Sequence, residues 1–110
     1  MFAYIFQRQK RFQEKFFDTD NLTDADKIKW TKEFVLAMHQ ELAEVMNSLD
    51  WKSYHAYKTH VYDINDTKEE IIDCFKFILN LMIVWGIDEK ELLDIFNKKS
   101  DVVETRLKLK

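Results

Sequence analysis

The stretch Thr67-Lys-Glu-Glu-Ile-Ile-Asp-Cys-Phe-Lys-Phe-Ile-Leu-Asn-Leu-Met-Ile-Val-Trp-Gly86 decides the fold. Drawn as a helix, it is apolar nearly all the way round between Cys74 and Trp85, and a helix without a polar face is enclosed by other helices or by a second subunit. Thr67 and Glu70 have the spacing of a capping box, which predicts a helix over about 68–85. Gly86 is placed to end that helix as a C′ glycine.

Three further helices are predicted around this central one. The first covers about 2–17, and the second covers about 26–48 after a loop over 18–26, in which Thr23 or Asp24 is the expected N-cap. Residues 51–66 lack a sustained helical stripe and are expected to form a connection. The fourth helix begins near 88 and continues to 96 or beyond. The apolar stripes of the first two helices consist of Phe2, Ile5, Phe6, Phe12 and Phe16, and of Phe34, Val35, Met38, Leu42, Val45, Met46 and Leu49.

The composition excludes several classes of protein. The 110 residues contain no proline and one glycine, which argues against β architectures and against the glycine-rich loops of Rossmann and P-loop enzymes. We therefore expect an all-α protein with a single domain over residues 1–110, a four- to five-helix bundle. Nine Phe, four Tyr and three Trp are many for so small a domain, so we expect apolar faces left over for a partner, with a homodimer as the favoured outcome.

The net charge and the cysteine content indicate which partners and which cellular compartment to expect. The net charge of −3 gives no general attraction to nucleic acid, although residues 98–110 carry five basic against two acidic side chains. The single cysteine, Cys74, excludes an internal disulfide and fits a reducing compartment. The apolar opening over 1–6 is too short for a signal peptide, and no run reaches the ~18 apolar residues of a membrane span. These features predict a cytoplasmic protein without a membrane or nucleic-acid partner.

Two pairs of acidic residues carry the chemistry that the sequence predicts. Glu41 and Glu44 are spaced three apart on the second helix, and Glu70 and Asp73 have the same spacing on the third. Residues three apart project from one side of a helix, and Asn80 continues the line from Asp73. Antiparallel packing of the two helices would bring four carboxylates together, which repel one another unless they are protonated or bind a cation.

The nature of these ligands favours one kind of metal. Carboxylate oxygens point to Mg²⁺, with Mn²⁺ as an alternative, rather than to zinc or copper. A di-iron site in a helical bundle uses Glu-x-x-His pairs, and no histidine of this chain lies three residues after a glutamate. Because 20 of 110 residues are acidic, each pair taken alone is also explained as a solvated helix face.

The run Glu41-Leu-Ala-Glu44-Val-Met-Asn47-Ser-Leu-Asp-Trp51-Lys52 and the later run Glu70-Ile-Ile-Asp73, with 25 residues between Glu44 and Glu70, together resemble the all-α nucleoside triphosphate pyrophosphatases. Within that superfamily it is most similar to the dimeric dUTPases. MazG-like relatives usually carry a second glutamate directly before the first ligand, where this chain has Gln40. The stretch over residues 6–16 resembles the first helix of the dUTPases, with Gln9 at the glutamine that reads the base.

The resemblance implies a function and a role for each matching residue. It implies Mg²⁺-dependent hydrolysis of a deoxynucleoside triphosphate, dUTP first among them, to dUMP and pyrophosphate, by a homodimer or a dimer of dimers. The implied metal ligands are Glu41, Glu44, Glu70 and Asp73, with Glu44 and Glu41 catalytic and Glu44 taking the proton of the attacking water. The implied base contacts are Gln9, Asn47 and Trp51, with Gln13 and Asn80 as additional site residues. The implied phosphate contacts are Lys52, Lys98 and Arg106, with Lys99 in the same segment.

Two other functions stay open at this stage. A related, MazG-like pyrophosphatase could use the same carboxylates on a different base, such as that of dCTP or of a damaged nucleotide. A non-enzymatic helical interaction module would explain the acidic pairs as surface charge alone. Measuring turnover of individual nucleotides distinguishes a MazG-like pyrophosphatase from a dUTPase. Stabilisation by Mg²⁺ is expected of either enzyme and not of the interaction module.

Overall fold

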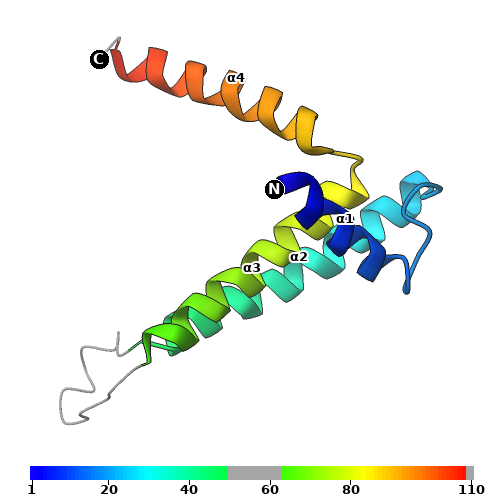
Figure 1. Ribbon diagram of the computed structural model, residues 1–110, viewed down its shortest axis with the longest axis horizontal. Helices are drawn as coiled ribbons and strands as arrows, with labels where there is room; N and C mark the ends of the chain where they lie inside the picture. The colour runs from blue at the N-terminus through cyan, green and yellow to red at the C-terminus, as the bar shows by residue number, and fades with distance from the viewer. Residues whose placement is uncertain (50–62, 109–110) are drawn as a thin grey trace.

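Four helices make up the part of the chain that the computed structural model describes, residues 1–49 and 63–108. They are α1 (Phe2–Gln13), α2 (Asp24–Asn47), α3 (Ile64–Val84) and α4 (Glu89–Lys108), and these ranges contain no strand (Figure 1). The predicted all-α class is therefore confirmed. None of these four helices combines the length and the apolar character that a membrane span requires.

The helices α2 and α3 lie side by side and antiparallel (Figure 1). Hydrogen bonds connect them at both ends: Ser48 and Thr67 join their hydroxyls at 2.8 Å, and Trp85 Nε1 donates to Thr31 Oγ1 at 2.8 Å. The antiparallel arrangement is the one that brings the two acidic pairs to the same level, and it sets the geometry of the site described below.

The start of α2 agrees with its predicted cap. Thr23 is the N-cap, and its side chain accepts a hydrogen bond from the Asp26 amide, while the Asp26 carboxylate accepts one from the Thr23 amide. This reciprocal capping box stabilises the first turn of the helix by satisfying two amides that have no partner within the helix.

The predicted start of α3 is wrong by about one turn. The helix begins at Ile64, and its N-cap is Asp63, whose side chain accepts a hydrogen bond from the Asn65 amide. Thr67 is inside the helix and contacts Ser48 of α2 instead of capping. The capping box predicted from Thr67 and Glu70 does not form because an earlier aspartate caps the helix, so the Glu70 carboxylate is available for another role.

The end of α3 is set by Gly86. Its φ of 70° is in the left-handed region that glycine adopts without strain. The amide of Ile87 donates to the Met82 carbonyl at 2.8 Å, and the amide of Gly86 donates to the Ile83 carbonyl at 3.2 Å. This pair of bonds is a Schellman motif, which confirms the predicted C′ glycine and sets the direction in which the chain leaves α3.

The helix α1 crosses α3 and closes the small core of the molecule. Phe6 of α1 packs with Leu79 and Ile83 of α3, and Leu92 at the start of α4 contacts this cluster. The helix ends at Gln13, a turn earlier than predicted. The chain then turns so that Phe17 contacts Trp30 of α2, with ring centroids 4.7 Å apart.

The helix α4 does not join the other three in a bundle, in contrast to the predicted architecture. Its backbone comes close to α1 only, and most of its length projects away from the α2–α3 pair (Figure 1). The radius of gyration is 17.9 Å, whereas a compact chain of this length has about 13 Å. Ile71, Ile72 and Ile78 of the central helix α3 are exposed, so one chain does not enclose this helix on every side.

Candidate metal centre and adjoining cavity

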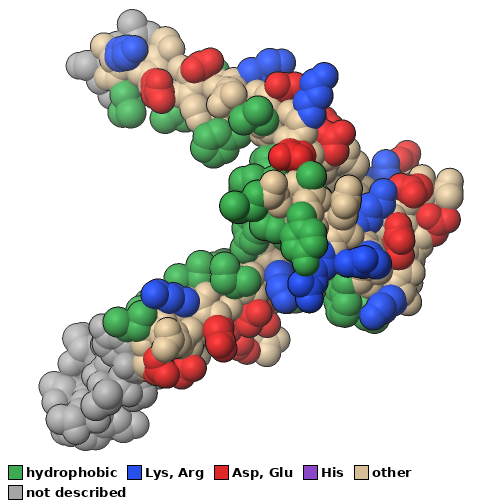
Figure 2. Space-filling model, in the orientation of Figure 1, with side chains coloured by type: hydrophobic (Ala, Val, Ile, Leu, Met, Phe, Trp, Pro, Cys, Tyr) green, Lys and Arg blue, Asp and Glu red, His purple; other side chains and the backbone are tan. Residues whose placement is uncertain are grey.

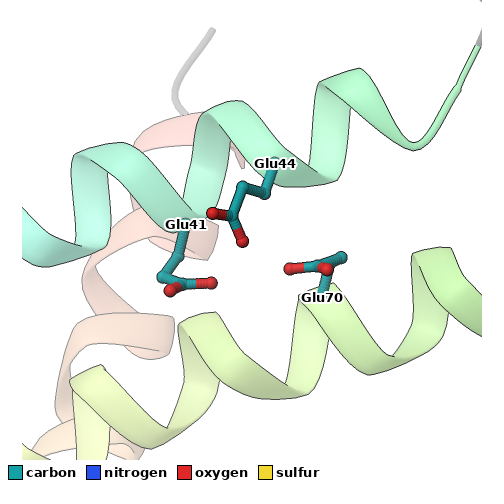
Figure 3. A group of neighbouring side chains, drawn as sticks. All are labelled: Glu41, Glu44 and Glu70. Atoms are coloured by element: carbon teal, nitrogen blue, oxygen red, sulfur yellow. The ribbon is translucent and has the colours of Figure 1, made fainter.

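Three carboxylates converge in the space between α2 and α3. Glu41 and Glu44 extend from α2, and Glu70 extends toward them from α3 (Figure 3). One carboxylate oxygen from each residue lies within 4.8 Å of the others. The three-residue spacing places Glu41 and Glu44 one turn apart on one side of α2. Antiparallel packing then brings Glu70 to the same level, as expected from the sequence.

Burial and nearby carboxylates raise the pKa of two groups in this cluster, Glu41 and Glu70. Burial raises the pKa of the Glu41 carboxyl above its ordinary value, and the charges of Glu44 and Asp73 raise it further. Burial is also the main cause that raises the pKa of Glu70, followed by its closeness to Glu44. The pKa of the neighbouring Cys74 thiol is raised as well, by burial and then by the surrounding carboxylates. The site is therefore a region where carboxyl groups are concentrated, and no cation from residues 1–49 or 63–108 pairs with them.

Two oxygens in this cluster have no partner. Glu41 Oε2 and Glu70 Oε2 are buried and accept no hydrogen bond from the residues that the structure describes. Within the same residues, no Lys or Arg forms an ion pair with the three glutamates. Buried acceptors without a donor or a cation are unfavourable. The arrangement therefore fits a divalent cation, whose ligands would supply the missing interaction.

The donor set fits Mg²⁺ in chemistry and in size. All three groups are carboxylates, which are the hard oxygen ligands that Mg²⁺ and Mn²⁺ prefer. Ligands of an octahedral Mg²⁺ lie about 3 Å apart when adjacent and about 4.2 Å apart when opposite, and the three carboxylate oxygens lie within 4.8 Å of one another. Asp73, the fourth predicted ligand, lies outside the tight group of three. It is nevertheless close enough to raise the pKa of both Glu41 and Glu70.

A cavity of about 500 Å³ adjoins the carboxylates. Glu41 and Asp73 form its acidic end, and it continues between α1, α2 and α3. Five of its lining residues are aromatic, and its polar lining consists of three side-chain amides, two carboxylates and one lysine. The lining residues are Gln9, Phe12, Gln13, Phe16, Trp30, Phe34, Glu41, Asp73, Lys76, Phe77 and Asn80.

The amides in this cavity hold one another in place. Gln9 Nε2 donates to Asn80 Oδ1 at 2.7 Å, across a sequence separation of 71 residues. Asn80 is 4% exposed and Gln13 is equally buried, so both are held firmly by their surroundings. In this orientation Gln9 Oε1 remains as an acceptor and Asn80 Nδ2 remains as a donor. The structure thus brings together Gln9, Gln13 and Asn80, three residues that the sequence singled out.

Sequence reasoning missed the aromatic walls as site residues. The rings of Trp30 and Phe34 stack with centroids 5.5 Å apart, and the centroids of the Phe34 and Phe77 rings lie 6.2 Å apart. The sequence pattern predicts Phe34 and Phe77 only as apolar residues of their helices and predicts no role for Trp30. The signal was present, because Trp30 lies four residues before Phe34 and extends the stripe of α2 by one turn. Lys76, the cation among the lining residues, also had no predicted role.

The remaining predicted site residues lie elsewhere. Asn47 is exposed at the end of α2 and is not among the residues that line the cavity. Lys98 and Arg106 are exposed on α4, whose backbone approaches neither α2 nor α3. They therefore lie on a helix that does not approach the carboxylates, and their contact with the phosphates stays a prediction. Trp51 and Lys52 lie outside the described residues.

Comparison with known proteins identifies one relationship. A family model described as dUTPase matches residues 1–108, nearly the whole chain. No match was found among curated proteins or among solved structures.

Proposed function

The chain belongs to the dUTPase family, and we propose that it hydrolyses dUTP to dUMP and pyrophosphate with Mg²⁺, or Mn²⁺, as cofactor. One observation carries the proposal beyond family membership. A cluster of three carboxylates, with no counter-ion among the described residues, adjoins a cavity lined with aromatic rings and amides. The cluster suits a metal-bound triphosphate, and the cavity suits a planar, hydrogen-bonding base.

The amides support uracil as the base. Uracil presents an N–H donor at N3 beside a carbonyl acceptor, and the free Gln9 Oε1 and Asn80 Nδ2 complement this pair. Cytosine presents an acceptor at N3 beside an amino donor, so both side-chain amides would have to rotate by half a turn to pair with it. A site that hydrogen-bonds a base edge rejects analogues that leave its buried groups unpaired. The orientation of the Gln9–Asn80 hydrogen bond therefore favours dUTP over dCTP.

The aromatic walls support binding of a base by stacking. Phe12, Phe34, Phe77 and Trp30 line the cavity with aromatic side chains. Stacking of a base on an aromatic side chain contributes about 1–3 kcal/mol and tolerates any base. We therefore assign affinity for the base to these rings and selectivity to the amides.

The carboxylates would hold the metal, with Glu41, Glu44 and Glu70 as ligands and Asp73 at the edge of the cavity. When bound, the metal supplies charge neutralisation at the phosphates and lowers the pKa of coordinated water. Glu44 would accept the proton of the attacking water, as the resemblance to the dUTPases implies. Glu41 would orient the same water from one turn earlier on α2. Lys76, at the wall between Asp73 and Asn80, would contribute positive charge near the substrate.

The test is a turnover panel. Purified protein is incubated with Mg²⁺ and each common dNTP in turn, and released pyrophosphate is measured. We expect dUTP to be preferred, and we expect Glu70→Gln to lose activity. Glu69→Gln is the matched control, because Glu69 is exposed on the same helix and lies outside the cluster.

Each alternative gives its own result. Preference for dCTP or a damaged nucleotide would assign the chain to a pyrophosphatase for another base. Absence of turnover with every nucleotide, together with no effect of Mg²⁺ on stability, would favour the non-enzymatic interaction module.

A further inference from the structure

The acidic end of the α2–α3 pair lies away from the buried core. The fully buried side chains of these two helices gather toward the end where α1 crosses α3: Phe34 of α2, and Leu79, Asn80, Ile83 and Val84 of α3. Leu79 lies nine residues after Glu70, which is about 13 Å along the helix. On the face shown in Figure 2, acidic side chains gather where α2 and α3 project away from α1. The carboxylates therefore face one another where little apolar packing holds the two helices together.

At this acidic end, a chain of hydrogen bonds joins α2 to α3. The Ser48 hydroxyl donates to the Val45 carbonyl at 2.7 Å, and the hydroxyl oxygens of Ser48 and Thr67 lie 2.8 Å apart. A hydroxyl carries one proton, so Thr67 is the donor to Ser48. Ser48 is the C-cap of α2, and the Val45 carbonyl belongs to the last turn, where carbonyls lack partners within the helix. One hydroxyl thus caps α2 and accepts the bond from α3.

This Ser48–Thr67 pair lies on the same sides of the helices as the carboxylates. Ser48 follows Glu44 by four residues, and Thr67 precedes Glu70 by three. Residues with these spacings are neighbours on one face of a helix, about one turn apart. Both hydroxyls are half-buried, so the bond between them is partly shielded from water. The pair is therefore the next layer of the α2–α3 contact after Glu44 and Glu70.

We propose that Ser48 and Thr67 are positioning residues of the metal centre, which hold α2 and α3 together against the repulsion of the carboxylates before a metal binds, and this assignment rests on the proposed function. One oxygen from each of the three glutamates lies within 4.8 Å of the others, and like charges this close repel strongly in a partly buried site. A hydrogen bond one turn away keeps the ligands at the spacing that a metal requires. The metal then does not have to draw the helices together, which would weaken its binding.

The opposite end of the helix pair offers a matched control. There Trp85 Nε1 donates to Thr31 Oγ1 at 2.8 Å, so a side-chain hydrogen bond joins α3 to α2 at that end as well. Thr31 lies ten residues before Glu41, about 15 Å along α2. Thr31→Val removes one interhelical hydrogen bond, as Thr67→Val does, but far from the carboxylates. A difference between the two variants therefore reports the position of the bond and not the loss of stability alone.

The first test measures metal affinity and does not depend on activity. Mn²⁺ is titrated into the wild-type protein and into each variant, and binding is followed by calorimetry. We expect Thr67→Val, and independently Ser48→Ala, to weaken Mn²⁺ binding about tenfold, the lower end of the loss caused by removing residues that orient metal ligands. Thr67→Ser keeps the hydroxyl and should bind Mn²⁺ as the wild type does, and so should Thr31→Val. Equal Mn²⁺ affinities of Thr67→Val and Thr31→Val would overturn the proposal.

The second test asks whether the pair holds the acidic end of α3 in the absence of metal. Hydrogen exchange of backbone amides reports local opening of a helix. In metal-free Thr67→Val, the amides around Glu70 should exchange about tenfold faster than in the wild type, because an interhelical hydrogen bond is lost there. Saturating Mg²⁺ should restore slow exchange, since bound metal joins the same two helices. Unchanged exchange around Glu70 in Thr67→Val, or exchange equally fast in Thr31→Val, would overturn the positioning role.

The two proposals fail in different ways. If the wild-type protein binds Mn²⁺ but hydrolyses no nucleotide, the proposed function fails, and the affinities of the variants still decide the role of the Ser48–Thr67 pair. If the wild type hydrolyses dUTP but Thr67→Val binds Mn²⁺ as tightly as Thr31→Val, the function stands and the positioning role is wrong. If both proposals hold, Thr67→Val reaches the wild-type rate at saturating Mg²⁺, whereas Glu70→Gln does not.

Discussion

Replacement of Gln9 by leucine tests the buried amide pair on which selectivity for the base depends. Gln9 Nε2 donates to Asn80 Oδ1 at 2.7 Å, and Asn80 is 4% exposed, so water cannot readily replace the lost donor. An unpaired buried polar group costs about 1–3 kcal/mol, which lowers the melting temperature of a domain of this size by about 4–12 °C. Gln7→Leu is the matched control, because Gln7 is exposed on the same helix.

The same substitution affects the reaction. Gln9→Leu removes the acceptor assigned to N3 of uracil, so KM for dUTP should rise about 10- to 100-fold. Thermal unfolding and steady-state kinetics measure the two effects separately. The double variant Gln9→Leu/Asn80→Leu should regain part of the stability, because both polar partners are then absent. A Gln9→Leu protein as stable as Gln7→Leu, with unchanged KM for dUTP, would refute the reasoning.

Three further predictions concern the carboxylates and the turn after α3. At neutral pH, millimolar Mg²⁺ should raise the melting temperature of the wild-type protein but not that of Glu70→Gln; an equal shift in both would contradict the assigned ligands. Because the pKa values of Glu41 and Glu70 are raised in the folded state, protonation of these two carboxyls stabilises the folded state. Metal-free protein should therefore lose stability as pH rises from the ordinary value of 4.5 through the raised values, and Glu41→Gln should flatten that loss in chemical denaturation. Gly86→Ala should lower the free energy of unfolding by about 1–2 kcal/mol, because alanine is strained at a φ of 70°. The added Cβ meets no atom within 4 Å, so a steric clash does not contribute to this loss. An unchanged denaturation midpoint would contradict the role of the turn.

Local patterns in the sequence were sufficient to predict the helices and the convergence of the glutamates. The apolar run before Trp85 and the single Gly86 predict a central helix and its end, because helix periodicity and glycine conformation are local properties. The spacing of Glu41 and Glu44 fixes their common side of α2. Apolar stripes favour packing of α2 against α3, and the antiparallel direction of these consecutive helices then brings Glu70 opposite Glu41 and Glu44.

Two kinds of feature were not predictable in this way: the choice between competing helix caps, and the packing of elements that are distant in the sequence. Asp63 and Thr67 both suit an N-cap, and the helix uses the earlier of the two. The direction of α4 depends on the turn geometry at Gly86 and on the packing of Leu92, neither of which an apolar stripe encodes. Trp30 becomes a cavity wall only because α1 crosses α3 and brings Gln9 and Phe12 near it. The direction of a helix and the cavities between helices result from contacts across the chain, which periodicity does not report.

The most direct test of the central claim is to locate a metal ion experimentally. A crystal grown with Mn²⁺, whose anomalous scattering identifies it, should show an ion bound to carboxylate oxygens of Glu41, Glu44 and Glu70 at about 2.0–2.2 Å. The same experiment on Glu70→Gln should show a weakened or absent peak. An ion bound elsewhere, or no ion between α2 and α3 at millimolar Mn²⁺, would contradict the account.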